Sequence, residues 1–215
     1  MKSISVFFLL MVCFLTVAFN IEARSKNKNA NRNSEATRIL IVGLEDNVKS
    51  NYFYNQLIAE ETGMKADLID AEYNSIISEN IASGCRNSDY AFIPASANII
   101  DGRILNEIKV LGESDESYSD ISSLCGEELK AALEKANADY LLVLNQHYLK
   151  WEERPLRTLF HIVSYSLYDK NKNQIHNGNN FFTSMSLENP DRIRKISRKS
   201  TSKIASAVIK SIDDK

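Results

Sequence analysis

Three histidines are the side chains of this chain that come nearest to a metal-binding set. Imidazole nitrogens are common zinc ligands, and a zinc site uses three or four protein ligands. His147, His161 and His176 all fall in a stretch that we expect to form neighbouring antiparallel strands. With a turn centred near Arg154, His147 lies roughly opposite His161 or its neighbour, but His176 falls near the other end of its strand pair. We therefore expect no metal site, and no cofactor of another kind.

Nucleophilic and nucleotide chemistry have little support in the sequence. None of the serines sits in the Gly-x-Ser-x-Gly turn of hydrolase nucleophiles. Gly43 ends the first expected strand, but the further glycines that let a backbone cradle a pyrophosphate are absent. Glu45 and Asp46 follow that strand, where open α/β sheets gather ligands, although acids before a helix also complement its dipole. The sequence thus predicts no catalytic and no cofactor-binding residues.

Two cysteines could pair in the exported protein. Of the three cysteines in the chain, Cys13 lies in the amino-terminal apolar run. This leaves Cys85 and Cys125, an even number in a compartment that permits disulfides. A bridge between them would close a loop of about 41 residues, for which chain entropy gives roughly 4 kcal/mol of stabilisation. We expect this disulfide, and two separate buried thiols are the alternative.

Residues 1–23 have the features of a cleaved secretory signal. Lys2 supplies a positive start, residues 6–19 are almost all apolar, and Ala23 is the small residue that a signal peptidase requires. The apolar run of about 14 residues is too short to cross a hydrocarbon core of roughly 30 Å. Cys13 lacks the small residue that precedes a lipidated cysteine. We expect cleavage after Ala23, no stable membrane span after cleavage, and export to the periplasm or the extracellular medium; a retained anchor is the alternative.

Composition favours one folded domain behind a disordered linker. Residues 24–37 are rich in Lys, Arg, Asn and Ser and have almost no apolar side chains, so they cannot offset the entropy of ordering. Residues 38–215, roughly 178 in number, suffice for one domain with a core. The net charge of -2 and the pI near 6.0 give no global field that would attract nucleic acid or an anionic membrane. We expect no nucleic-acid binding.

The amino-terminal half of the domain alternates strands and helices. Residues 38–43 form a continuous apolar run closed by glycine, which is typical of a strand buried on both faces. The next stretch has apolar residues at helical spacing and stops at Gly63, a typical helix C-cap. Residues 88–123, an insertion, show no clear periodicity. The expected order is a strand at 38–43, a helix at 47–62, a strand at 66–71, a helix at 72–80 and a strand at 89–94.

The carboxy-terminal half predicts a helix, three antiparallel strands and a closing helix. The apolar stripe of the first helix needs a sheet to pack against. The closing helix starts at Asn189-Pro190-Asp191, which supplies an N-cap, a proline at the first helical position and an acid in the first turn. The expected elements are a helix at 127–138, strands at 140–151, 158–168 and 174–185, and a helix from 190 onward. The fold class is therefore α/β: a single domain, a mixed sheet with a C-terminal three-stranded antiparallel portion, and helices packed on the sheet.

Two surfaces could receive a partner. The first half of the closing helix is crowded with cations, which helical spacing would align toward an acidic partner; a solvated face opposite the apolar stripe is the alternative. The hairpin between the first two of the three strands is rich in aromatic residues, and its tip could form a recognition surface, although strand aromatics also build cores. The candidate interaction residues are Trp151, Arg157, Arg194, Arg198 and Lys199.

Three stretches of the chain carry a family resemblance. They are Lys65 to Ser78, Leu133 to Val143, and Ser166 to Ile175. They resemble a group of bacterial envelope proteins. Its members are the amino-terminal domain of the TolB translocation protein, the periplasmic lipoprotein activators of penicillin-binding proteins and the curli-secretion lipoprotein. The resemblance implies a mixed sheet covered by helices and a non-catalytic role in docking envelope partners. The chain departs from the lipoprotein members because it lacks a usable lipidation cysteine and inserts residues 88–123.

We therefore expect a secreted or periplasmic, non-catalytic protein-interaction module of the bacterial cell envelope, with an envelope protein as its partner. Two alternatives from other classes stay open. One is a secreted hydrolase with a site in residues 88–123, and the other is a small-ligand binding protein that uses the end of the first strand. A pocket lined by convergent polar groups would favour these alternatives, whereas an exposed aromatic or basic patch would favour the module.

Overall fold

The computed structural model describes residues 36–96 and 100–215, so the predicted signal and nearly all of the predicted linker lie outside the described residues. The strands are β1 (Thr37–Gly43), β2 (Val48–Ser50), β3 (Tyr90–Pro94), β4 (Lys109–Leu111), β5 (Tyr118–Asp120), β6 (Tyr140–Glu152), β7 (Thr158–Asp169) and β8 (Gln174–Ser184). The α-helices are α2 (Asn55–Thr62), α3 (Ile69–Gly84), α4 (Gly102–Asn106), α5 (Gly126–Lys135) and α6 (Pro190–Asp213). Two 3₁₀ turns complete the order, η1 (Ala66–Leu68) and η2 (Ser114–Glu116).

The sheet is mixed, as the sequence predicts. Across the described residues its strand order is β3-β1-β6-β7-β8, with the short β2 beside β6. β1 runs parallel to both β3 and β6, whereas β6, β7 and β8 form an antiparallel meander. β4 and β5 pair with each other in a separate ribbon. The predicted fold class and the predicted antiparallel portion are therefore confirmed.

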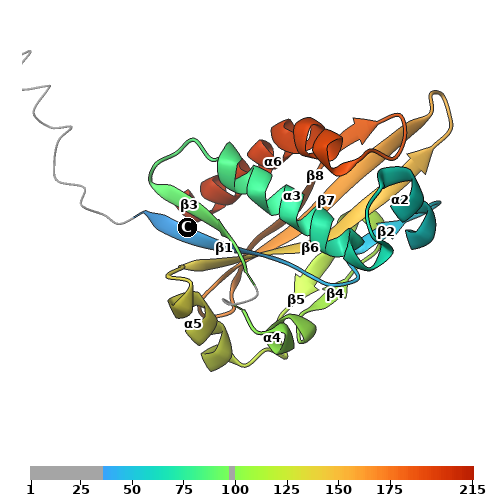
Figure 1. Ribbon diagram of the computed structural model, residues 1–215. Coiled ribbons are helices and arrows are strands. Elements are labelled where there is room, and N and C mark those ends of the chain that lie inside the picture. The colour runs from blue at the N-terminus through green and yellow to red at the C-terminus, as the bar shows by residue number, and fades with distance from the viewer. Residues whose placement is uncertain (1–35, 97–99) are drawn as a thin grey trace, which may run out of the picture. The chain divides into compact units, whose positions relative to one another are not determined.

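Helices cover the two faces of the sheet unequally (Figure 1). α3 and α6 lie together on one face and enclose the larger core, which includes Leu142, Leu149 and Tyr73. α5 and the segment around α4 cover the other face of β1 and β6, where Leu141 and Val143 point. Successive strand residues point to opposite faces, so the continuous apolar run of β6 supplies both cores.

A β-bulge interrupts β6 between Leu144 and Gln146. One extra residue, Asn145, shifts the alternation, so that Leu144 and His147 both face α3 and α6 although three positions separate them. Asn145 is buried, and its side-chain amide donates to Ser117 O and to Ser166 Oγ, 3.1 and 3.0 Å away. The bulge thus ties the sheet to the segment that covers its second face.

The predicted strand at 66–71 is wrong, because these residues form η1 and the first turn of α3. Ile69, Tyr73 and Ile76 recur at helical spacing, and all three are buried against the sheet. Asp70 and Glu72 lie in the first turn, where acids complement the helix dipole. Periodicity over a longer window therefore outweighs the short apolar run that suggested a strand.

The predicted helix at 47–62 begins later than expected. Residues 48–50 form β2, and the helix starts at Asn55. Ser50 Oγ accepts the backbone N–H groups of Tyr52 and Phe53, which holds the chain in a turn between the two elements. The predicted C-cap is confirmed, because Gly63 adopts a left-handed conformation with φ of 75°. No described helix is long and apolar enough to cross a membrane.

Candidate functional site

α3 and α6 cross closely because small residues meet at the crossing. A Cβ atom on Gly84 would lie 3.3 Å from Ser202 Cα, so a larger residue would push the helices apart. Ser202 Oγ donates to Gly84 O over 3.2 Å. Nearer the start of α6, the buried Asn80 amide donates to Arg194 O and to Ser197 Oγ, 2.7 and 2.8 Å away. These bonds fix the position of α6 along α3.

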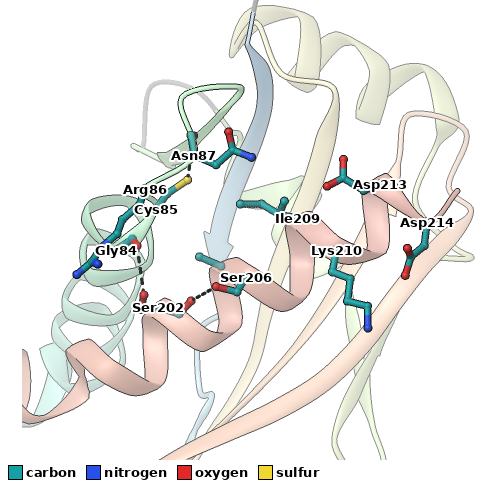
Figure 2. A pocket seen from close by; sticks show the side chains of 11 residues that line it. Gly84, Cys85, Arg86, Asn87, Ser202, Ser206, Ile209, Lys210, Asp213 and Asp214 are labelled. Carbon is teal, nitrogen blue, oxygen red and sulfur yellow. Dashed lines mark hydrogen bonds between the residues drawn. The ribbon is translucent and has the colours of Figure 1, made fainter. Parts of the chain in front are cut away.

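A groove runs along the outer side of this crossing. It consists of two adjoining hollows of about 430 and 780 Å³, which share the residues Gly84, Arg86, Ser202 and Ser206. Figure 2 shows the smaller hollow, with Arg86 and Asn87 on the loop after α3 and Lys210, Asp213 and Asp214 on the last turns of α6. We call the whole feature the α3–α6 groove.

The larger hollow of the α3–α6 groove is strongly basic. Arg198, Lys199 and Lys203 come from one side of α6, and Arg86 faces them from the loop after α3. All four side chains are exposed, and within residues 36–96 and 100–215 none of them forms an ion pair. Of the residues that the structure describes, no acidic one lines this hollow, whereas serine hydroxyls and Asn80 do. The hollow therefore offers unpaired cations and hydrogen-bond donors together, which suits an anionic group.

Two acids beside the groove are bonded to other residues: Glu79, which precedes Asn80 on α3, and Asp213, which lines the smaller hollow. Glu79 pairs with Arg194, and hydrogen bonds from Ser75 and Arg194 hold the pKa of the Glu79 carboxyl below its usual value. At the far end of α6, Asp213 accepts a hydrogen bond from Tyr90 Oη, which raises the pKa of Tyr90 to about 12. Acidic charge is thus concentrated at the end of the groove that Figure 2 shows, away from the larger hollow.

The five candidate interaction residues do not form one surface. Arg198 and Lys199 line the α3–α6 groove, but Arg194 is bound to Glu79 beside it. Arg157 lines a different hollow of about 370 Å³, near the start of α6. Sequence reasoning missed Arg86, because an isolated arginine more than one hundred positions before α6 carries no sequence signal of its own.

Trp151 belongs to an aromatic cluster at the base of the hairpin tip. Its ring lies 5.8 Å from the ring of Phe53 and 6.2 Å from that of Tyr52. The Asn51 side chain bonds both backbone groups of Trp151, accepting from its N–H over 2.8 Å and donating to its carbonyl over 3.1 Å. Trp151 is therefore engaged in packing, whereas Leu156, in the turn between β6 and β7, is 76 % exposed.

The expected disulfide is not formed in the structure, where Cys85 and Cys125 are both free thiols. Cys85 follows α3 and packs against the core between the helices and the sheet. Cys125 is the N-cap of α5, which lies on the opposite face. A disulfide requires Cα atoms within about 7 Å, and here a sheet separates the two residues. Sequence spacing gave no information on which face each cysteine would occupy.

Alkylation with iodoacetamide should therefore modify both thiols of the unfolded, unreduced protein. In the folded protein Cys125 should react first, because its side chain is exposed and that of Cys85 is half-buried. Intact-mass measurement counts the adducts, and a reduced sample provides the reference. If the unreduced sample takes up no label, Cys85 and Cys125 are joined by the disulfide that the sequence predicts.

The histidines occupy two separate places. His147 and His161 are buried side by side with ring centroids 5.7 Å apart. The strand register differs from the predicted one by two residues, because His147 pairs with Val163 and His161 pairs with Leu149. His176 stands apart on β8, where its Nε2 lies 3.4 Å from Tyr165 Oη. Among the described residues, no three His, Cys, Asp or Glu side chains are grouped so that they could hold a metal ion.

The two alternative sites are the end of β1, for a small ligand, and the 88–123 insertion, for a hydrolase. A hollow of about 500 Å³ does open at the carboxyl ends of β1 and β3, and Glu45 lines it. Two of its other polar side chains make structural bonds: Asp70 accepts from Val48 N over 2.7 Å, and Asn74 donates to Leu44 O over 2.9 Å. In the described part of the 88–123 insertion, no serine bonds a histidine; Ser119, for example, bonds Tyr168.

Comparisons with known proteins give only distant structural neighbours. The sequence matches no protein-family model and no curated protein. The PelC dodecamer of Paraburkholderia phytofirmans is 10% identical, with 80% of this chain and 87% of that chain covered and a TM-score of 0.39. The LpoB C-terminal domain of Salmonella enterica is 16% identical over 73% and 90%, with a TM-score of 0.29. A lipoprotein of Neisseria meningitidis is 11% identical over 83% and 99%, with a TM-score of 0.30. A lipoprotein is thus among the neighbours, but at these TM-scores the likeness carries no argument about family or function.

Proposed function

We propose that this protein is an exported, non-catalytic interaction module of the cell envelope that holds an acidic segment of a protein partner in the α3–α6 groove. The proposal rests on four cations around one hollow that form no ion pair within the described part of the chain, namely Arg86, Arg198, Lys199 and Lys203. Export rests on the signal-like residues 1–23.

Charge complementarity makes an acidic segment the best-suited occupant. The protein as a whole carries a net charge of -2, so this local excess of positive charge is not a general property of its surface. Carboxylates accept hydrogen bonds from guanidinium and ammonium groups, and such charge-assisted bonds are about twice as strong as neutral ones. A groove between two helices, rather than a closed cavity, leaves room for a continuous peptide chain to enter and leave.

Reversing the charge of the groove should abolish binding of an acidic peptide. The probe is a fluorescein-labelled peptide of eight glutamates, and fluorescence anisotropy at low salt gives its dissociation constant. The variant Arg86→Glu/Arg198→Glu/Lys199→Glu should weaken binding at least about tenfold, because each exposed ion pair contributes about 0.2–1 kcal/mol and reversal adds repulsion. Added salt should also raise the dissociation constant of the parent for the peptide, because salt screens the attraction between exposed charges.

The matched control carries the same change in charge outside the groove. Lys65, Lys109 and Lys170 are exposed and line none of the hollows at the α3–α6 crossing. Lys65→Glu/Lys109→Glu/Lys170→Glu should bind the peptide within about twofold of the parent, because local charge rather than net charge sets the affinity. If both variants lose affinity equally, or if neither does, the groove is not the binding surface. Equal binding of anionic vesicles and peptide by the parent would also count against a protein partner.

A further inference from the structure

β8 is the outermost strand of the described sheet, and it is built in an unusual way for an edge. It is 11 residues long, QIHNGNNFFTS, and contains no Lys, Arg, Asp, Glu or Pro. Proteins usually protect a sheet edge with charges, prolines or shortness, because a free edge can pair with another chain. The opposite edge, β3, follows that rule: it has 5 residues and ends in Pro94.

The backbone of β8 presents hydrogen-bonding groups away from β7. The N–H of Phe181 donates to the side chain of Asn180 over 3.0 Å rather than to β7. In an antiparallel strand the N–H and C=O groups of one residue point to the same side. The backbone N–H and C=O groups of the odd-numbered residues around Phe181 therefore point away from β7, toward the outer edge of the sheet. Asn179, Phe181 and Thr183 are also exposed as side chains.

An apolar surface lies beside this edge on the face that α3 and α6 do not cover. In the second half of β8, even-numbered residues point to α6, since Phe182 is in the larger core and Asn180 accepts from Ser200 Oγ. Phe181 therefore points to the other face, where its ring lies 5.8 Å from that of Phe160 and its side chain is 56 % exposed. A large exposed aromatic next to a free edge marks a contact surface.

We propose that β8 pairs antiparallel with β8 of a second copy of this chain, so that the two sheets become one. A twofold axis perpendicular to the sheet brings each strand against itself, which makes the contact self-complementary. A charged strand would repel its own copy in this arrangement, but β8 carries no formal charge. The same axis places both Phe160–Phe181 pairs on one face, where they extend a common apolar surface.

Sedimentation equilibrium of the exported protein tests the pairing. The parent should dimerise, with a dissociation constant below about 100 μM, which corresponds to roughly 5.5 kcal/mol of association free energy. Phe181→Lys/Thr183→Lys places two cations on the edge and should raise that constant at least tenfold, with an unchanged circular dichroism spectrum. The control Tyr54→Lys/Leu156→Lys changes two exposed side chains outside β8, one at the start of α2 and one in the turn between β6 and β7, and it should dimerise like the parent.

Symmetric cross-linking tests the geometry independently of affinity. In a background of Cys85→Ser/Cys125→Ser, single cysteines replace Asn177, Asn179, Phe181 or Thr183 in turn. Oxidation should join two copies at the position nearest the twofold axis and fail for a cysteine that replaces Leu156. A parent that stays monomeric at 100 μM, or a dimer that Phe181→Lys/Thr183→Lys leaves intact, would overturn the proposal, whether or not the α3–α6 groove binds its peptide.

Discussion

Acidification from pH 6.5 to pH 4 should destabilise this protein by about 3 kcal/mol through His161 alone. The His161 ring is fully buried, stacked on Phe182 with centroids 4.5 Å apart, and burial lowers its pKa to about 3. In the unfolded chain the same imidazole has its ordinary pKa near 6.5. Below pH 6.5 the His161 imidazole is protonated in the unfolded state but stays neutral in the folded state. The free energy of unfolding therefore falls as the pH falls from 6.5 toward 3.

His147 should increase this loss. It is buried next to His161 under Tyr73, and burial followed by repulsion from His161 lowers its pKa well below the ordinary value. Neither ring nitrogen of His147 has a hydrogen-bond partner among the described residues, nor does Tyr73 Oη. A charged His147 ring would therefore find no hydrogen-bond acceptor among the described residues, and the His161 ring has one hydrogen bond there, between its Nε2 and Ser184 Oγ over 3.0 Å.

Chemical denaturation at a series of pH values measures the effect. In His147→Phe/His161→Phe the stability should lose most of its dependence on pH between 6.5 and 4, with smaller contributions left from Glu79 and His176, whose pKa values are also lowered. His176→Asn is the control, because that histidine is only half-buried, and it should keep most of the parental slope. The Asp169 carboxyl affects stability only at lower pH. Burial raises its pKa, but hydrogen bonds from Lys215 and Asn173 outweigh burial and hold the pKa at about 2. An unchanged slope in the double variant would refute the histidine explanation.

Replacing Gly43 by alanine should cost about 3 kcal/mol, because overpacking and a broken buried hydrogen-bond network each cost about 1–3 kcal/mol. A Cβ atom at position 43 would lie 2.2 Å from Asn74 Cγ, which no packed structure tolerates. Asn74 joins α3 to the end of β1 through Leu44 O, and it also bonds Asn47, whose amide reaches Leu144 O over 3.2 Å. Moving Asn74 therefore loosens the link between α3, β1 and β6.

A double-mutant cycle separates this clash from other effects. Asn74→Gly removes the obstructing side chain, so Gly43→Ala should cost much less in that background than in the parent. Gly102→Ala is the matched control, because a Cβ atom there meets nothing within 4 Å. Urea denaturation gives the free energies. If Gly43→Ala is as mild as Gly102→Ala, the glycine is not needed for the approach of α3 to β1.

The sequence predicts the fold well where each element carries its own signal. The Asn189-Pro190-Asp191 start of α6 is confirmed by the hydrogen bond that Arg192 N donates to Asn189 Oδ1. The meander β6, β7 and β8 follows from apolar runs separated by polar turns. The strand predicted at 66–71 fails because a six-residue window cannot distinguish a buried strand from the first turn of a buried helix.

The candidate site is less predictable because it depends on residues that only the fold brings together. The cations of α6 are visible in the sequence, but their alignment with Arg86 depends on how closely Gly84 and Ser202 let two helices approach. Trp151 suggests a recognition surface in the sequence, yet its neighbours Tyr52 and Phe53 come from a loop a hundred residues away. Spacing along the chain holds no information on such contacts.

The pairing of β1 with β6 also determines how the chain can assemble. Ile39 pairs with Tyr140, so this contact closes a loop of about 100 residues, whereas β6, β7, β8 and α6 are neighbours in sequence. Long loops lose more entropy on closure and slow folding. The carboxy-terminal meander can therefore form first and serve as the template on which β1 docks. During synthesis the amino-terminal strand, although made early, has to wait for the last third of the protein before its sheet exists.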